Sequence, residues 1–262
     1  MRTWFRIFFI GGVISFRALF SWIRPSVYIP TLMLGPTTQI LFFAYLGRTA
    51  HLKSDSWFVV GNAVQSASLA ALFGMGFAID GERWTQTLSA VLATPANRAA
   101  LFLGRALPVL VNAAVVASTG FVGGALLLGF RMPWSSVPTL ALLVLLASFA
   151  CTGLGMLVGA VGLRMRDVPI IANLTMAVLL IFCGVNVPLD KLPHWMHMTA
   201  EGLPVTHAIA AARRVADGAS LGSVETPALT ELGLGAVYLL VGFMLLRLFE
   251  LQGRRHGTLD RA

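Results

Sequence analysis

The chain has 262 residues, of which 57% are hydrophobic and only 11% are charged, and its formal net charge is +8. Soluble domains usually contain about 25% charged residues, and a soluble fold could not bury so much apolar surface behind so few charges. The composition therefore excludes a soluble enzyme, a disordered chain and a fibrous repeat, and it predicts an all-α integral membrane protein.

The 17 Arg against two Lys weakly indicate a GC-rich bacterial genome. Cys151 and Cys183 lie in apolar runs, so neither a disulfide nor a zinc site is expected.

The N-terminal segment, residues 1–26, is predicted to form an amphipathic helix on the membrane surface. When the segment is drawn as a helix, its four arginines fall on one narrow face, and Trp and Phe side chains cover much of the rest. Arginines on such a face can bind lipid phosphates. The apolar stretch is short and has no small-residue cleavage site, so a signal peptide is not expected. The arginines are Arg2, Arg6, Arg17 and Arg24.

Six segments have the roughly 20 mostly apolar residues that a helix needs to cross a bilayer. They are residues 27–46, 57–79, 106–130, 138–163, 168–187 and 228–249. We expect Glu231 and Arg247, which flank the last apolar stretch, to extend toward the two interfaces. Residues 27–249 would then form one transmembrane domain, and residues 250–262 a cytoplasmic tail. The pairs Gly120/Gly124 and Gly155/Gly159 indicate close contacts between helices.

The distribution of positive charge predicts the orientation of these spans. With six spans both termini share one side, and that side holds 13 of the 19 Lys and Arg residues but only five of the 11 acids. The whole net charge thus falls on one face. By the positive-inside rule, both termini are cytoplasmic in a plasma membrane, which in a bacterium is the inner membrane. The orientation in the membrane accounts for the net positive charge, so no nucleic-acid partner is expected.

The second connection, residues 80–105, has the pattern of a short amphipathic helix. Trp84, Leu88, Val91 and Leu92 recur at helical spacing, and Thr94-Pro95 is typical of a helix restart. We therefore expect a cytoplasmic amphipathic helix, a hinge, and a second helix leading into the third span. Its apolar face requires lipid headgroups or another protein as a partner, unless it is an ordinary interfacial linker.

The connection on the other side, residues 188–227, is rich in proline and too polar to span the membrane. Residues 196–214 predict two short helices that are separated at Gly202-Leu203-Pro204. We expect these helices to enter the outer interface without crossing it.

Two motifs and the span pattern together resemble the membrane permease of ABC transporters of the transmembrane type-2 class, which are exporters. The chain is similar to the daunorubicin-type drug-resistance permeases, and the lipo-oligosaccharide branch remains open. The first motif consists of Glu82, Arg83, Thr87, Leu88, Leu92, Thr94, Pro95 and Arg98. The second consists of Pro188, Leu192, Pro193, Trp195, Leu203, Pro204, Thr206, His207, Arg213 and Gly218.

The resemblance implies that the first motif, together with Trp84, couples the permease to a separate ATPase. Trp84, Leu88 and Leu92 would fill an apolar cleft of the ATPase, while charged neighbours would set the register. The partners would be two ATP-binding subunits, a second permease chain (identical or a sister) and membrane lipids. ATP and Mg would bind to the ATPase subunits and not to this chain. The second motif would form the outer re-entrant segment.

Other chemistries find little support in the sequence. No phosphate-binding Gly-x4-Gly-Lys-Ser/Thr loop occurs, and we expect no catalytic residue on this chain. His194, His197 and Glu201 have helical spacing, but a metal site is not expected without His-Glu-x-x-His. The main alternatives are a secondary carrier coupled to ions and a membrane scaffold. No acid is expected deep in any span, which disfavours proton coupling. The mid-span amides either line a substrate path or join helices, and they are Asn62, Gln65, Asn112, Asn173 and Asn186.

The charge distribution leads to a test of orientation. A reporter enzyme fused after Ala262 should be active in the cytoplasm, and one inserted near Ser54 should be active outside. Both activities are measured in whole cells and normalised to expression. The reverse pattern would contradict the orientation that the charge count predicts.

Overall fold

The computed structural model describes residues 9–13, 25–84, 98–165 and 167–256. In this part of the chain all regular structure is helical, as predicted, and residues 9–13 are helical within the N-terminal segment. The longer helices are α2 (Pro25–Thr49), α3 (Asp55–Trp84), α5 (Arg98–Leu128), α6 (Val137–Met165), α7 (Val168–Phe182) and α10 (Glu225–His256). Shorter helices are η1 (Trp134–Ser136), η2 (Leu189–Lys191), α8 (His194–Gly202), α9 (Thr206–Ala216) and η3 (Leu221–Val224).

Four helical segments of the described chain are long and apolar enough to cross a membrane. They cover Asp55–Gly81, Leu103–Leu128, Trp134–Gly162 and Leu221–Phe249. These segments make the chain a multi-pass membrane protein. Helix α2 covers the first predicted span and α7 covers most of the fifth. Because α7 has only 15 residues, it is about 22 Å long at 1.5 Å per residue, shorter than a hydrocarbon core of about 30 Å.

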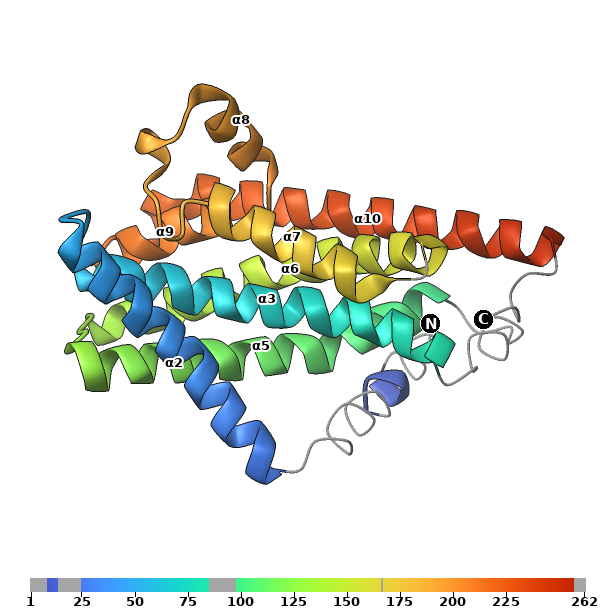
Figure 1. Ribbon diagram of the computed structural model, residues 1–262, viewed down its shortest axis with the longest axis horizontal. Helices are drawn as coiled ribbons and strands as arrows, with labels where there is room; N and C mark the ends of the chain where they lie inside the picture. The colour runs from blue at the N-terminus through green and yellow to red at the C-terminus, as the bar shows by residue number, and fades with distance from the viewer. Residues whose placement is uncertain (1–8, 14–24, 85–97, 166, 257–262) are drawn as a thin grey trace.

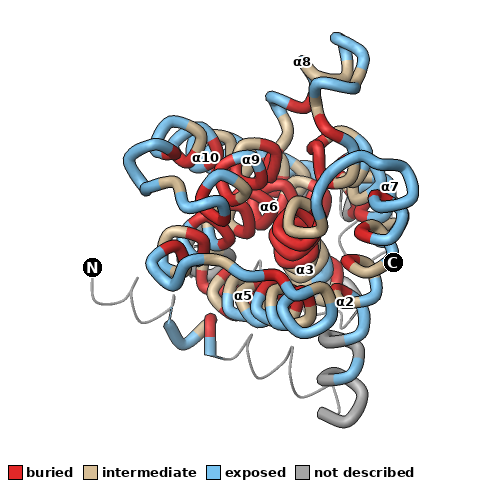
Figure 2. Tube along the Cα trace, turned by 90° about the vertical axis from the view of Figure 1, so that its left-hand side faces the viewer, coloured by how far each residue is buried: buried red, intermediate tan, exposed pale blue. Residues whose placement is uncertain are grey.

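Helix α3 lies at the centre of the bundle. In the view along the bundle, α3 and α6 are surrounded by α2, α5, α7, α9 and α10 (Figure 2). In the side view α3, α5, α6, α7 and α10 lie roughly along the long axis, α2 is inclined to it, and α8 projects from the bundle (Figure 1). The candidate span in α3 is 83% buried, against 17% for the one that covers η3 and most of α10. A helix that is apolar on all sides and buried is expected at the core of such a bundle.

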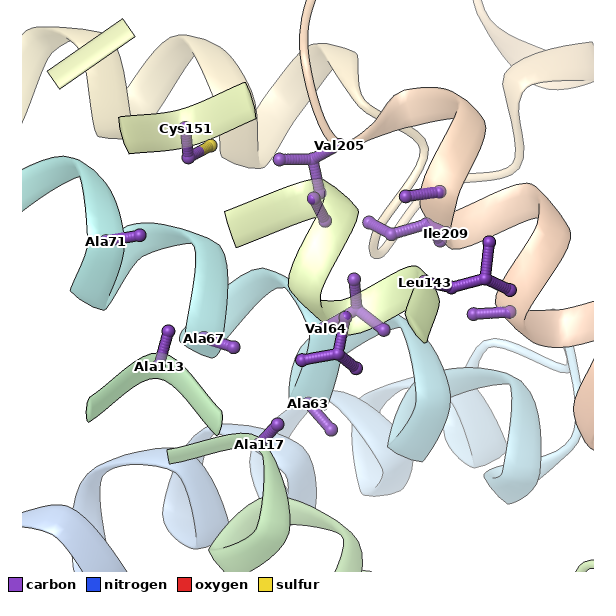
Figure 3. Packing of buried hydrophobic residues seen from close by; sticks show 14 of the residues in the cluster. Ala63, Val64, Ala67, Ala71, Ala113, Ala117, Leu143, Cys151, Val205 and Ile209 are labelled. Carbon is purple, nitrogen blue, oxygen red and sulfur yellow. The ribbon is translucent and has the colours of Figure 1, made fainter. Parts of the chain in front are cut away.

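Small residues allow the helices to approach α3 closely. On the facing sides of α3 and α5, Ala63 and Ala67 lie near Ala117 and Ala113 (Figure 3). Both glycine pairs identified in the sequence face α3 within the same chain. A methyl group at Gly120 or Gly124 would meet Ala63 or Val59, and one at Gly155 or Gly159 would meet Leu72 or Ile79.

The ends of three elements differ from the sequence prediction. Helix α3 runs without a break through Trp84, so residues 80–84 continue the second predicted span as one helix, and the rest of the predicted amphipathic helix lies outside the described residues. Helix α7 ends at Phe182, where we predicted a span to residue 187, because Gly184 adopts a φ of +69° that a helix cannot accommodate. The last helix begins at Glu225, three residues before the predicted span.

The close contact between α3 and α6 leads to a stability test. Gly155→Ala should destabilise the protein by about 1–3 kcal/mol, because the added methyl group would overlap backbone atoms of Leu72, which cannot move aside as a flexible side chain can. Gly233→Ala is the matched control, since nothing lies within 4 Å of a methyl group there. Thermal unfolding of both variants in detergent provides the measurement. Equal midpoints for the two variants would contradict the packing described.

Candidate functional site

The chain leaves helical geometry between α7 and α9, at the end of the bundle where α3 begins. Residues 183–188 are not helical, and a second break at Leu203–Val205 separates α8 from α9. Val185, Pro204 and Val205 are buried, so their backbone groups are removed from solvent. Buried peptide groups need partners, and here side chains from other elements supply several of them.

Arg213 of α9 binds the first break. Its guanidinium donates to the carbonyl oxygens of Gly184 and Val185, both at 2.8 Å, and to that of Trp57 at 3.2 Å. The Cζ atom lies 3.4 Å from the centroid of the Trp57 ring, a cation–π contact. Gly61 leaves room for the guanidinium, because a methyl group there would overlap it. Burial lowers the pKa of Arg213 to about 9, so the side chain remains charged at neutral pH.

Glu231 of α10 binds the second break. This carboxylate is fully buried and accepts hydrogen bonds from the backbone N–H groups of Val205 at 2.6 Å and Ala208 at 3.2 Å. It therefore caps the N-terminus of α9, where unpaired N–H groups and the helix dipole favour a negative charge. Our prediction that Glu231 extends to the interface is wrong, since its side chain is fully buried. The carboxylate turns inward because α9 offers it two backbone donors.

Further contacts fix the same turn. The Tyr238 hydroxyl of α10 donates to the carbonyl of Gly202 at 2.9 Å, and the Cys183 thiol lies 3.4 Å from the carbonyl oxygen of Pro204. Val205 has a φ of +80°, which is rare for a β-branched residue and costs on the order of 1–3 kcal/mol. The N–H bond to Glu231 holds this strained residue in place.

A chain of amides joins the break to α2 and α3. The Asn62 side chain, which is fully buried, accepts from Gln39 at 3.0 Å and donates to Asn186 at 2.9 Å. The Gln65 amide, one turn further along α3, is also buried and has no hydrogen-bond partner among the described residues. Asn112 is half-buried, while Asn173 is exposed on α7 and bonds to the carbonyl of Pro169. A role for these five amides in lining a path stays a prediction.

The two predicted short helices are present, with a break at Leu203–Val205. The residues of the second motif frame these elements. Pro188 and Pro193 precede η2 and α8, and Leu192 follows η2. Trp195 is 63% exposed and packs edge-on against Phe182, at 5.9 Å between ring centroids. Pro204 is buried and His207 bonds to the carbonyl of Glu201.

Two histidines of this region contact different groups of Glu201. His197 lies 3.6 Å from the Glu201 carboxylate, whereas His207 bonds to the backbone of Glu201. Among the residues that the structure describes, no group of three or more His, Cys, Asp or Glu side chains is placed to hold a metal ion.

The other end of α3 carries the start of the first motif. Glu82, Arg83 and Trp84 form the last turn of α3, and Arg98 begins α5. Arg105 joins these two helices by donating to the carbonyl of Ala78 at 3.3 Å. Thr87, Leu88, Leu92, Thr94 and Pro95 lie outside the described residues.

Comparison with known proteins assigns the family. The sequence model described as ABC-2 type transporter matches residues 9–216. The chain belongs to this family, and it is therefore a permease component of an ABC transporter. A search of curated proteins found no significant match.

The hydrogen bonds and the ring contact of Arg213, here called the Arg213 clamp, can be tested by substitution. Arg213→Lys should destabilise the protein by about 2–4 kcal/mol, because an ammonium cannot reproduce the planar fork that reaches three carbonyls and stacks on Trp57. The neighbouring Arg214 is exposed, so Arg214→Lys is a control that should cost less than about 0.5 kcal/mol. Thermal unfolding in detergent measures both. A similar loss in the two variants would show that the clamp does not stabilise the fold.

Proposed function

We propose that this chain is the permease subunit of an ATP-driven exporter that moves an amphipathic or lipid-like molecule, such as a drug, outward across a bacterial inner membrane. A separate ATPase would supply the energy and would bind the ATP and Mg. Two ATPase subunits would dock at the end of the bundle where α3 ends. Both termini of the permease would lie on that cytoplasmic side.

One structural observation carries this proposal. Helices α3 and α5 both continue beyond their candidate spans at the same end of the bundle, α3 from Gly81 to Trp84 and α5 back from Leu103 to Arg98. The bond from Arg105 to the Ala78 carbonyl connects the two helices near that end. The ends of these two helices support our proposal that the connection with the coupling motif lies at the membrane surface.

The central position of α3 suggests how a force on this connection would reach the opposite end. A helix of 30 residues is about 45 Å long. The last turn of α3 carries part of the motif, and Trp57 in its first turn is bound by Arg213 of α9. A displacement of α3 would therefore pull on α9 and on the break that Arg213 holds. ATP would only bias the equilibrium between two such arrangements.

The exposed surface of α7 supports the proposal that a second permease chain packs against this one. This helix is short, and Ile170, Leu174, Val178 and Ile181 form an exposed apolar stripe along it. Asn173 lies exposed beside this stripe. An exposed amide is unfavourable against lipid tails and favourable across a helix interface, where it can hydrogen-bond. We propose that a second copy or a sister chain covers α7.

We infer the substrate class from Glu231, because this buried carboxylate is not free to bind an ion or a proton. Glu231 is buried in a span, but both its carboxylate oxygens already accept backbone hydrogen bonds. An acid used in this way is structural, which favours ATP coupling over proton coupling. The interior of the described bundle suits an amphipathic molecule better than a bare ion.

The coupling motif leads to the main test of function. Leu88→Asp should insert normally, because residue 88 lies outside the spans. It should lose the ATPase in pull-downs from membranes and lose transport in vesicles. An unpaired charge in a desolvated contact costs several kcal/mol, which is at least about a hundredfold in affinity. Glu82→Ala and Arg98→Ala should have milder effects, since charges at a rim act more on rate and register.

Gln86→Asp is the matched control, because the sequence pattern predicts residue 86 on another helical face of the same segment. It adds the same charge and should keep the ATPase bound. If Leu88→Asp inserts and keeps both its ATPase and its transport, the coupling proposal fails, and a secondary carrier becomes the better account.

A further inference from the structure

An apolar groove of about 490 Å³ lies between α6 and the start of α10. This volume is in the range of about 300–1,000 Å³ that is typical of small-molecule sites. The groove lies at the α9 end of the bundle, because η3 and the first turns of α10 form one of its walls. Its lining residues are Leu142, Leu146, Leu221, Gly222, Glu225, Ala228, Leu229 and Leu232.

The groove opens toward the bilayer. Its walls belong to two of the candidate spans, and Leu142, Leu229 and Leu232 are each more than 40% exposed. No described element of the chain covers these side chains. In a membrane, the molecules that meet an open apolar groove at this position are the acyl chains of the adjacent leaflet.

Two opposite charges lie at the end of the groove where α10 begins. Glu225 is exposed in the first turn of α10, and no described cation forms an ion pair with it. Arg214 is also exposed and lies 3.5 Å from the carbonyl oxygen of Ser223, two residues before Glu225. The Glu225 carboxylate thus lines the groove, and the Arg214 guanidinium lies against Ser223, next to the lining residue Gly222.

We propose that the groove holds an acyl chain of a zwitterionic aminophospholipid. Its primary ammonium would bind Glu225 and its phosphate would bind Arg214, since guanidinium groups match phosphate geometry. An anionic phospholipid without an amine would leave Glu225 unpaired. A quaternary ammonium has no N–H with which to hydrogen-bond the carboxylate. The charges therefore favour phosphatidylethanolamine over phosphatidylglycerol and phosphatidylcholine, and this inference does not depend on the direction or energy source of transport.

Native mass spectrometry of the full chain tests this proposal. The protein is released from detergent with equal amounts of dioleoyl phosphatidylethanolamine and dioleoyl phosphatidylglycerol, and the first bound lipid is identified. Glu225→Gln should reduce the preference for phosphatidylethanolamine by up to about fivefold, which is the range for an exposed ion pair. Asp217→Asn, a carboxylate at the same end that does not line the groove, should leave the preference unchanged.

A second pair of variants tests the groove itself. Leu229→Trp should fill the groove and abolish the first bound lipid of either type, with Leu232→Trp as a second filling variant. Leu240→Trp is the control, because Leu240 is exposed on α10 outside the groove. An unchanged preference in Glu225→Gln, or equal lipid retention in the filled and control variants, would overturn the proposal. Loss of dimer with unchanged lipid binding in Leu229→Trp would also overturn it and assign the groove to a second chain.

Discussion

The requirement that buried backbone groups find partners shapes this protein. In a helix the backbone satisfies its own hydrogen bonds, but α7 stops after 15 residues, and buried parts of the chain are not helical at residues 183–188 and again at Leu203–Val205. Each break leaves carbonyl and N–H groups inside the bundle, where no solvent can replace the lost hydrogen bonds. Arg213 supplies donors to the first break and Glu231 supplies acceptors to the second. The buried carboxylate and the half-buried guanidinium are therefore consequences of the interrupted backbone.

The same contacts connect the break to the rest of the bundle. Arg213 also binds the carbonyl of Trp57 at the start of α3, and Glu231 lies on α10. Helix α9 is therefore fixed to the central helix on one side and to the last helix on the other. Because α3 runs without a break to the motif at its other end, the interrupted segment and the surface that we propose for the ATPase share one rigid element. This geometry is suited to a permease in which a force from the ATPase at one end of α3 changes the conformation of the interrupted segment at the other end.

The sequence was sufficient for the parts of the fold that depend on hydrophobicity alone. The all-helical class, the helices over the predicted spans and a break near Pro204 follow from apolar length and from proline, although the break lies at Leu203–Val205, one residue later than predicted. The glycine pairs were also readable as sites of close contact, although their partner helix was not. Sequence alone could not show that α3 continues through Trp84, because a change from apolar to amphipathic residues is compatible with one helix or two.

Glu231 shows why the candidate site was harder to predict than the fold. An acid at the edge of an apolar stretch is ordinarily expected to extend to the interface. Whether it turns inward depends on donors 23 and 26 residues away in the sequence, on Ala208 and Val205. Tyr238 was missed for the same reason. The only available signal was the combination of a proline-interrupted segment with charged residues on both sides, which implies unsatisfied backbone nearby.

The central claim is that α3 and α9 move as one unit during the transport cycle. Spin labels at Ser54 and Asp217, in a background with Cys151→Ala and Cys183→Ser, report the distance between the start of α3 and the end of α9. Pulsed electron paramagnetic resonance of the permease with its ATPase would measure this distance without nucleotide and with ATP trapped. Our account predicts the same distance distribution in both states, and a broader one in the Arg213→Lys variant. A shift of several ångströms on ATP binding in the protein with Arg213 intact would contradict it.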